Sequence, residues 1–325
     1  MLNNIRLDGT ITLLSPLSHI GESIGPDSYL SQDIIIGSDG QPLECFVFSG
    51  NAFRGILRDT SAQYMLDKMG GLKLPLDTFY LLFSGGALGG AQSVDIDQAR
   101  AYRKNIPMLS VFGGGVGNQI LTGKIKVGSM YPLVSECQRV LPQHLRQDNA
   151  PSWERWTFEK SFTRMDDAKN DNRREYLAIP DKEQQDMIAG EKPKKKKDEP
   201  PQQMRYSVEM LAAGSVLYQR IDLADMSDIE LGAFVSALAE FSKSPYVGGK
   251  SGTGHGLCDV EYSWRPAGTN NEPQKFISIS ADTLWLSESA ERAKQQYDTF
   301  LLSLYNQYLD DNQTELKQLL VGVAK

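Results

Sequence analysis

The chain has 325 residues, of which 40% are hydrophobic and 23% are charged, and its formal net charge is −7 at pH 7. This length is enough to bury a full core, either as one large domain or as a domain with sizeable insertions. The sequence has no apolar run near the roughly 20 residues that span a bilayer and no basic-then-apolar leader, so we expect a cytoplasmic protein without a membrane partner.

The charge is unevenly distributed along the chain. Between residues 139 and 205 basic residues slightly outnumber acidic ones, whereas residues 207–325 are strongly acidic. A net negative charge argues against a simple nucleic-acid binder. A local stripe of basic residues can still bind RNA, because salt screens acidic residues that lie more than about 10 Å away. The composition therefore permits RNA binding without requiring it.

The three cysteines, Cys45, Cys137 and Cys258, are widely spaced and belong to no CxxC motif. No pair of histidines accompanies them. This pattern argues against both a disulfide framework and a zinc site, and we expect no cofactor.

Hydrophobic periodicity predicts both strands and helices in the first half of the chain. Residues 4–14 alternate apolar and polar side chains, as a half-buried strand does. A second strand over 44–48 leads to a helix over 51–68. A short helix near 94–103, bracketed by two glycine-rich segments, and a strand over 119–127 complete this half.

A long hairpin is predicted in the middle of the chain. Residues 157–164 and 204–221 have strand-like patterns, and between them residues 181–203 are polar and charged, with four consecutive lysines. Such a composition cannot build a core, so we expect the hairpin to have a mobile tip.

The last third contains the clearest helix. Ser227 and Glu230 have the spacing of a capping box, and apolar residues follow at helical intervals as far as Phe241. A strand over 257–263 and an amphipathic helix over 287–310 come after it. The strand spacing does not suggest repeated right-handed crossovers. We therefore expect an α+β fold, with an antiparallel sheet, helices on one of its faces and a long inserted hairpin.

Residues 247–256 (VGGKSGTGHG) match a phosphate-binding P-loop only in part. That motif requires a glycine where Ser244 stands, with a strand before it and a helix after it, whereas here a helix precedes and a strand follows. A nucleotide-hydrolysing site is therefore not predicted. The glycines would still let backbone N–H groups approach a phosphate chain, and Lys250 adds charge. The alternative is a tight turn between the helix and the strand.

Residues 49–58 (SGNAFRGILR) place small polar side chains at a helix start, with Ser49 as the expected N-cap. Arg54 and Arg58 follow one helical turn apart. A helix N-terminus carries a partial positive charge and free N–H donors, so this end suits a phosphate. The alternative is an arginine pair on a solvated helix face.

Four segments in this order resemble motifs of the RAMP superfamily, the RNA-binding proteins of class 1 CRISPR systems. The segments are residues 49–58, Val111-Phe112-Gly113 with the strand at 121–127, Glu209 to Ser215, and Val247 to Gly256. The resemblance covers residues 5–263 and is greatest to the type IV backbone subunit, with type III next.

The resemblance implies a ferredoxin-like, RRM-related antiparallel sheet, called the palm, with helical insertions and a long inserted β-hairpin, called the thumb. We expect residues 1–156 to form the first part of the palm and residues 157–206 to form the thumb. Residues 207–325 would then form the second part of the palm and a C-terminal helix.

A backbone subunit of this family polymerises along CRISPR guide RNA. The resemblance implies that copies of the chain assemble head to tail on the guide, beside other effector-complex subunits, and present it for pairing with foreign DNA or RNA. A protein that coats many sequences must read phosphate and shape rather than bases. The expected contacts are Ser49, Asn51, Arg54 and Arg58 at the helix start, Gly248, Gly249, Lys250 and Ser251 in the late loop, and Arg164, Met165, Arg173 and Arg174 in the thumb, with Met165 or Tyr176 as the wedge between bases.

Two alternatives to this function remain open. One is a ribonuclease of the same superfamily. Type III relatives cut target RNA with a metal and an Asp, but Leu30 falls at that position, with Asp27 and Asp33 nearby. Processing nucleases often use a histidine as the base, for which His19 is the candidate. We expect neither reaction, because neither residue has an identifiable partner. The other alternative is a protein-only scaffold, which the acidic last third would suit.

Overall fold

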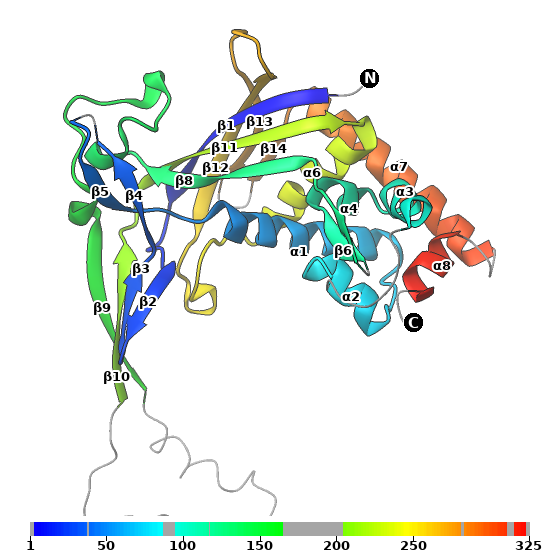
Figure 1. Cartoon of the computed structure of the whole chain (residues 1–325), viewed down its shortest axis with the longest axis horizontal. Helices are drawn as coiled ribbons and strands as arrows, with labels where there is room; N and C mark the ends of the chain where they lie inside the picture. The colour runs from blue at the N-terminus through cyan, green and yellow to red at the C-terminus, as the bar shows by residue number, and fades with distance from the viewer. Residues whose placement is uncertain are drawn as a thin grey trace, which may run out of the picture.

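The computed structural model describes residues 3–37, 39–86, 95–116, 118–164, 204–280, 283–310 and 315–322 (Figure 1). A six-stranded sheet carries most of the helices on one face, and a smaller four-stranded sheet extends away from it on the left of Figure 1. The expected mobile tip, residues 181–203, lies outside the described residues.

The large sheet is antiparallel throughout, with the strand order β14-β13-β12-β1-β11-β8. Its strands are β1 (Asn3–Leu13), β8 (Ile125–Pro132), β11 (Val216–Met226), β12 (Cys258–Pro266), β13 (Gln274–Ser280) and β14 (Thr283–Leu286). Along β1 the side chains of Leu7 and Ile11 are fully buried, whereas Arg6 and Asp8 lie on the opposite face. The predicted half-buried strand is therefore confirmed.

Helix α6 (Asp228–Phe241) is the centre of the core. Its capping box is present as the sequence predicted, with Ser227 and Glu230 each bonded to the other's backbone N–H. From Glu230 to Phe241 every residue is buried. The helix is covered on all sides because the sheet lies over it, while α1 (Gly50–Lys68), α4 (Pro107–Phe112) and α7 (Glu288–Asp310) pack around it.

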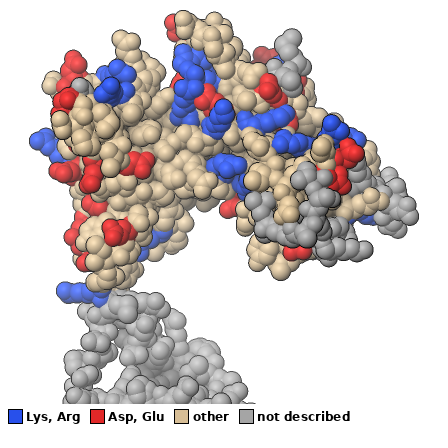
Figure 2. All heavy atoms as spheres, viewed as in Figure 1, with Lys and Arg blue, Asp and Glu red and all other residues tan. Residues whose placement is uncertain are grey.

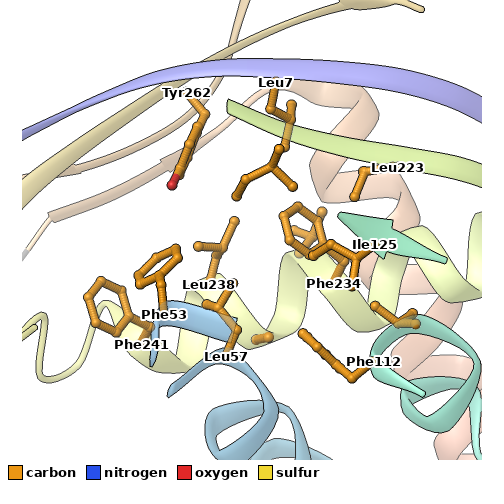
Figure 3. Packing of buried hydrophobic residues seen from close by; sticks show 14 of the residues in the cluster. Leu7, Phe53, Leu57, Phe112, Ile125, Leu223, Phe234, Leu238, Phe241 and Tyr262 are labelled. Atoms are coloured by element: carbon orange, nitrogen blue, oxygen red, sulfur yellow. The ribbon is translucent and has the colours of Figure 1, made fainter. Parts of the chain in front are cut away.

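Apolar side chains from three layers meet at α6 (Figure 3). Leu7 and Leu223 point down from the sheet, and Phe234 and Leu238 of α6 lie beneath them. On the other side Phe53 of α1 packs edge-on against Phe241, with 5.7 Å between the ring centroids. This continuous core fixes the start of α1 relative to the sheet.

One buried polar contact crosses the middle of the sheet. The Tyr262 hydroxyl on β12 reaches over β1 and donates to the side-chain oxygen of Gln219 on β11, which in turn donates to the Gly128 carbonyl. The ring passes over Gly9, where an added Cβ would lie 2.2 Å from it. Glycine at position 9 is therefore required by this crossing.

The smaller sheet contains the base of the predicted hairpin. Its strands, in the order β2-β3-β10-β9, are β2 (Ile20–Ile24), β3 (Asp27–Leu30), β10 (Met204–Leu211) and β9 (Thr157–Arg164). β9 and β10 are antiparallel and paired in register from Thr157 opposite Leu211 to Arg164 opposite Met204. β10 also pairs in parallel with β3.

Two predicted strands are each divided in the structure. The stretch 204–221 is β10 and β11, which belong to different sheets, because a turn with Gly214 at a φ of 87° separates them. The stretch 119–127 is β7 (Gln119–Leu121) and the start of β8, because Gly123 packs tightly against the end of α4. In both cases a glycine held by a tertiary contact or a turn interrupts an apolar pattern that reads as continuous.

The other elements are short, and several were not predicted. They are β4 (Gln32–Ile36) paired with β5 (Pro42–Phe46), β6 (Gly114–Val116) paired with β7, helices α2 (Leu76–Phe83), α3 (Ile96–Asn105) and α8 (Glu315–Gly322), and single 3₁₀ turns at Ser135–Cys137, Gln143–Leu145, Trp153–Trp156 and Ser251–Thr253. Among the described residues, no helix combines the length and the apolar character needed to cross a membrane.

Candidate nucleic-acid interface

The start of α1 has no side-chain cap. Ser49 adopts an extended conformation before the helix, but its side chain accepts no hydrogen bond, and the first turn contains no acidic residue. The partial positive charge at the N-terminus of α1 is therefore not neutralised by a residue of its own first turn. Gly50 lies directly against β8, where an added Cβ would be 2.4 Å from the Val127 carbonyl. The next residue, Asn51, is exposed.

Arg58 faces the interior rather than the solvent. Its guanidinium donates to the carbonyls of Phe112 and Gly113, at 2.7 and 3.0 Å, and the residue is only 8% exposed. Burial lowers the pKa of Arg58 to about 10, and the nearby charge of Arg54 acts in the same direction. The sequence placed Arg58 at a phosphate. In the structure its guanidinium instead contacts the turn that ends α4.

Arg54 is half-buried and lies one turn closer to the helix start. Its Nη2 donates to the carbonyl of Phe112, which Arg58 also contacts. Its buried Nε has no hydrogen-bond partner within the described part of the chain.

The segment that follows β1, residues 18–19, and the late loop that precedes β12 lie side by side next to the start of α1. The Ser49 N–H donates to Nε2 of His19, at 3.3 Å, and the Gly249 N–H donates to the carbonyl of Ser18, at 2.7 Å. Gly248 has a φ of 79°, and a Cβ there would lie 2.4 Å from the same carbonyl. The helix start, residues 18–19 and the late loop are therefore joined in one continuous surface.

Lys250 connects the late loop to the hairpin. It is in the left-handed conformation, with a φ of 62°, and its Nζ lies 4.7 Å from the ring centroids of both Phe162 and Tyr206. Figure 1 shows the late loop, in yellow, below the start of α1 and beside the smaller sheet. The sequence did not single out Phe162 and Tyr206, although both are aromatic residues in predicted strands.

His255 is a second contact between this loop and the hairpin. Only 5% of the residue is exposed; its Nδ1 lies 2.9 Å from the Thr253 hydroxyl and its Nε2 lies 3.4 Å from Nζ of Lys160. Burial lowers the pKa of His255, and the positive charge of Lys160 lowers it further. The imidazole is therefore neutral at pH 7, and both ring nitrogens have protein partners.

The two candidate catalytic residues lie on neighbouring segments, since the Ser31 N–H, two residues before Asp33, donates to the His19 carbonyl at 2.7 Å. His19 is half-buried against Phe48, with ring centroids 4.4 Å apart, and burial lowers its pKa. Asp33 is exposed on β4, in a groove of about 550 Å³ that it lines with Arg139 and Tyr131. Within the described ranges, no three His, Cys, Asp or Glu residues gather as a metal site would require.

The residues near Asp33 have structural partners. The Leu30 N–H donates to a carboxylate oxygen of Glu209, at 2.9 Å, and the Ser207 hydroxyl donates to Asp27. Both contacts tie β3 to β10. Of the thumb residues expected at the RNA, Arg164 ends β9 without a described side chain, and Met165, Arg173, Arg174 and Tyr176 lie outside the described residues.

Basic side chains gather on one part of the surface. Figure 2 shows Lys and Arg concentrated in the upper middle of the view, where Figure 1 draws the six-stranded sheet and α1, whereas Asp and Glu are more frequent on the left. Several of the sheet arginines are paired: Arg6 and Arg220 contact Asp222, and Arg265 contacts Asp8. These two aspartates neutralise part of the positive charge of the three arginines.

Comparisons with known proteins support the fold. No protein-family model matches the sequence, and no curated protein matches it. A chain in the solved structure "Type IV-B CRISPR Complex" matches with a TM-score of 0.53 and 19% identity, over 85% of this chain and 96% of that one. The chain has the fold of that CRISPR-complex subunit. The predicted α+β fold is therefore confirmed.

A second match is looser. The crystal structure of Thermofilum pendens Csc2 matches with a TM-score of 0.41 and 11% identity, over 97% of this chain and 84% of that one. A TM-score this low does not by itself support a shared fold.

Proposed function

We propose that this chain is a backbone subunit of a class 1 CRISPR effector complex, most like type IV. In this role it binds guide RNA through the phosphates, and its copies lie head to tail along the guide, beside other effector subunits. The guide is then presented for pairing with foreign DNA or RNA. The fold shared with a subunit of a type IV-B complex supports this proposal.

The single observation that favours RNA binding is the continuity of three segments. The contacts of Ser49 with His19, of Ser18 with Gly249 and of Lys250 with Phe162 connect the helix start to the hairpin without a break. A continuous surface of this kind suits an extended strand better than a compact ligand.

The chemistry of this surface fits phosphate. The helix start offers uncapped N–H groups beside the polar side chains of Ser49 and Asn51, with the charge of the half-buried Arg54 one turn further along. In the late loop, the N–H groups of Ser251 and Gly252 donate to no carbonyl within the described ranges. Backbone donors of this kind contact phosphates without reading bases, as a subunit that coats many guides requires. Gly248, Gly249 and Lys250 shape the same loop, and the thumb residues Arg164, Met165, Arg173 and Arg174 would add contacts to the RNA.

We infer that the chain does not cleave RNA. Nε2 of His19 accepts from Ser49, and both ring nitrogens of His255 are engaged. Asp33 lies on β4, where it lines a groove with Tyr131 and Arg139. Metal-dependent cleavage at Asp33 remains the alternative, and its test is cleavage of RNA complementary to the guide, lost in Asp33→Ala.

The test of RNA binding uses a substitution that the fold should tolerate. Asn51→Glu places a carboxylate in the first turn of α1, where it stabilises the helix by about 0.3–1 kcal/mol and repels phosphate. We expect affinity for single-stranded RNA to fall by about tenfold or more, because like charges in contact cost at least 1.4 kcal/mol.

Gln63→Glu is the matched control, since it makes the same charge change at an exposed position of the same helix, about 18 Å further along. Affinity should be nearly unchanged in this variant. Equal RNA affinities of the two variants would show that the start of α1 does not contact RNA. Wild-type protein that neither co-purifies with RNA nor binds it would instead favour a protein-only scaffold.

A further inference from the structure

Two aromatic rings mark a point far along the hairpin. Phe162 on β9 and Tyr206 on β10 are direct partners in the ladder, and their rings stack with centroids 5.3 Å apart and planes inclined by 14°. They lie five residues beyond the first pair, Thr157 with Leu211, or roughly 17 Å along the strands. Because this point is far from the base, a contact here restricts the orientation of the hairpin more strongly than a contact at the base.

The late loop makes such a contact with two side chains. Nζ of Lys250 lies 4.7 Å from both centroids, within the range of cation–π attraction. The ring of His255 meets Phe162 edge-on, at 6.0 Å, and its Nε2 lies 3.4 Å from Nζ of Lys160. The late loop thus contacts both rings through Lys250 and the ring of Phe162 through His255.

The loop itself is fixed to the segment that connects β1 of the large sheet to β2. Besides the Gly249 contact to Ser18, the Gly256 N–H donates to the Pro16 carbonyl, at 2.8 Å. A Cβ on Gly256 would lie 1.9 Å from the Val247 carbonyl, so the two ends of the loop are pressed together. The loop that contacts the hairpin is therefore itself held in place at both of its ends.

The backbone of Lys250 indicates that its side chain is needed. The loop has five glycines among ten residues, yet Lys250 occupies a left-handed position, with φ 62° and ψ 25°. Side chains other than glycine are disfavoured there. A strained lysine in a loop that uses glycine freely points to a role for the ammonium group.

The hairpin has a separate attachment at its base. The Leu211 N–H donates to the Leu17 carbonyl at 2.9 Å, and the Ala212 N–H donates to the Trp156 carbonyl at 2.7 Å. Further along, β10 is also held by β3, through the pairing of Ser207 with Asp27, whereas β9 is the edge strand of the sheet. The contact at Phe162 and Tyr206 ties both β9 and β10 to the late loop and so restricts the pivoting of the hairpin about its base.

We propose that Lys250 is a positioning residue that fixes the angle of the hairpin to the large sheet through Phe162 and Tyr206, and that it is not a phosphate contact. Its consequence for assembly rests on the proposed function, since a fixed hairpin would reach a neighbouring subunit's RNA in one orientation. The contact itself exists without RNA and can be tested without it.

The first test is hydrogen exchange on the full chain, washed free of nucleic acid at high salt. In Lys250→Gly the cation is lost while the left-handed backbone is relieved, so added strain cannot explain a loss of protection. We expect exchange of the β9 and β10 amides to rise by about three- to tenfold, with β12 unchanged. Lys250→Arg keeps a cation that stacks on aromatic rings and should restore protection. Hairpin exchange equal to that of the wild type in Lys250→Gly would overturn the proposal.

The second test separates positioning from phosphate contact. For single-stranded RNA, each phosphate neutralised contributes about 0.7 to the slope of log affinity against log salt. A positioning role predicts parallel slopes for the wild type and Lys250→Gly. A slope reduced by about 0.7, with unchanged hairpin exchange, would assign Lys250 to the phosphate. Wild-type protein that binds no RNA would refute the proposed function while leaving the exchange result to decide the role of Lys250.

Discussion

The six-stranded sheet and the hairpin sheet differ in how their strands are held. In the large sheet, every residue from Glu230 to Phe241 of the covering helix is buried, and β1 buries alternate side chains completely. In the small sheet, all five residues of β2 are exposed, and so are most of the described residues of β9. The first region therefore buries most of the apolar side chains, whereas the second buries only a few, on β10 and at the end of β3, among them Val208 and Met210. A protein that combines a rigid sheet with a projecting hairpin can distribute its buried residues in this way.

The largest expected effect contrasts the two regions directly. Phe234 is fully buried in α6, so Phe234→Ala should lower the free energy of unfolding by about 3–5 kcal/mol. Phe158 on β9 is 39% exposed, and Phe158→Ala should cost about 1 kcal/mol or less. Urea denaturation of both variants measures the contrast. Comparable losses would show that the hairpin sheet contributes to the global core after all.

Arg58 offers the next test, because it was expected at the RNA and is found inside. Arg58→Met removes a charged donor from the carbonyls of Phe112 and Gly113 and should cost about 2–4 kcal/mol of stability. RNA affinity, measured on the protein that remains folded, should be close to that of the wild type. A variant of unchanged stability that loses RNA would return Arg58 to the interface.

Two glycines in opposite surroundings sharpen the packing comparison. At Gly9 an added Cβ would lie 2.2 Å from the Tyr262 ring, so Gly9→Ala should destabilise the protein by about 1–3 kcal/mol. At Gly55, within α1, a Cβ would meet nothing within 4 Å, so Gly55→Ala should stabilise the protein by about 0.5–1 kcal/mol. Thermal unfolding of the pair gives shifts of opposite sign. Shifts of the same sign would contradict the tight crossing of Tyr262 over β1.

The smallest effect is a pH dependence at the hairpin contact. Burial and Lys160 lower the pKa of His255 from its ordinary value of 6.5. The unfolded chain therefore takes up this proton at a higher pH than the folded chain does, and stability falls as the pH drops below 6.5. In His255→Gln this part of the pH dependence should be absent, while that of His19 is retained. Identical profiles of unfolding free energy against pH in the two proteins would exclude the contribution.

Much of the large sheet and its helices could be predicted, because one buried face leaves a regular period in the sequence. The alternation in β1 and the capping box before α6 are local signals. The complete burial of α6 was not evident from its apolar stripe. Its small residues were the missed signal: a Cβ on Gly232 would lie 2.2 Å from the Ala293 carbonyl of α7, so the two helices pack in close contact.

The site could be predicted only where its residues are close in sequence. The helix start and the late loop were recognisable as possible phosphate contacts. The pairing of Phe162 with Tyr206 depends on the register of two strands separated by a long polar segment, which no local pattern fixes. The inward direction of Arg58 likewise depends on where α4 ends.

The turn between β10 and β11 gives the hairpin a mechanical connection to the rest of the molecule. Only four residues, 212–215, separate the hairpin strand from β11, which is zipped to β1 along most of its length. A pull on the hairpin would therefore load the interior of the large sheet in shear, across many hydrogen bonds at once, rather than peel an edge strand. The hairpin would transmit the force to the large sheet, and the contacts of the hairpin with the late loop would break first.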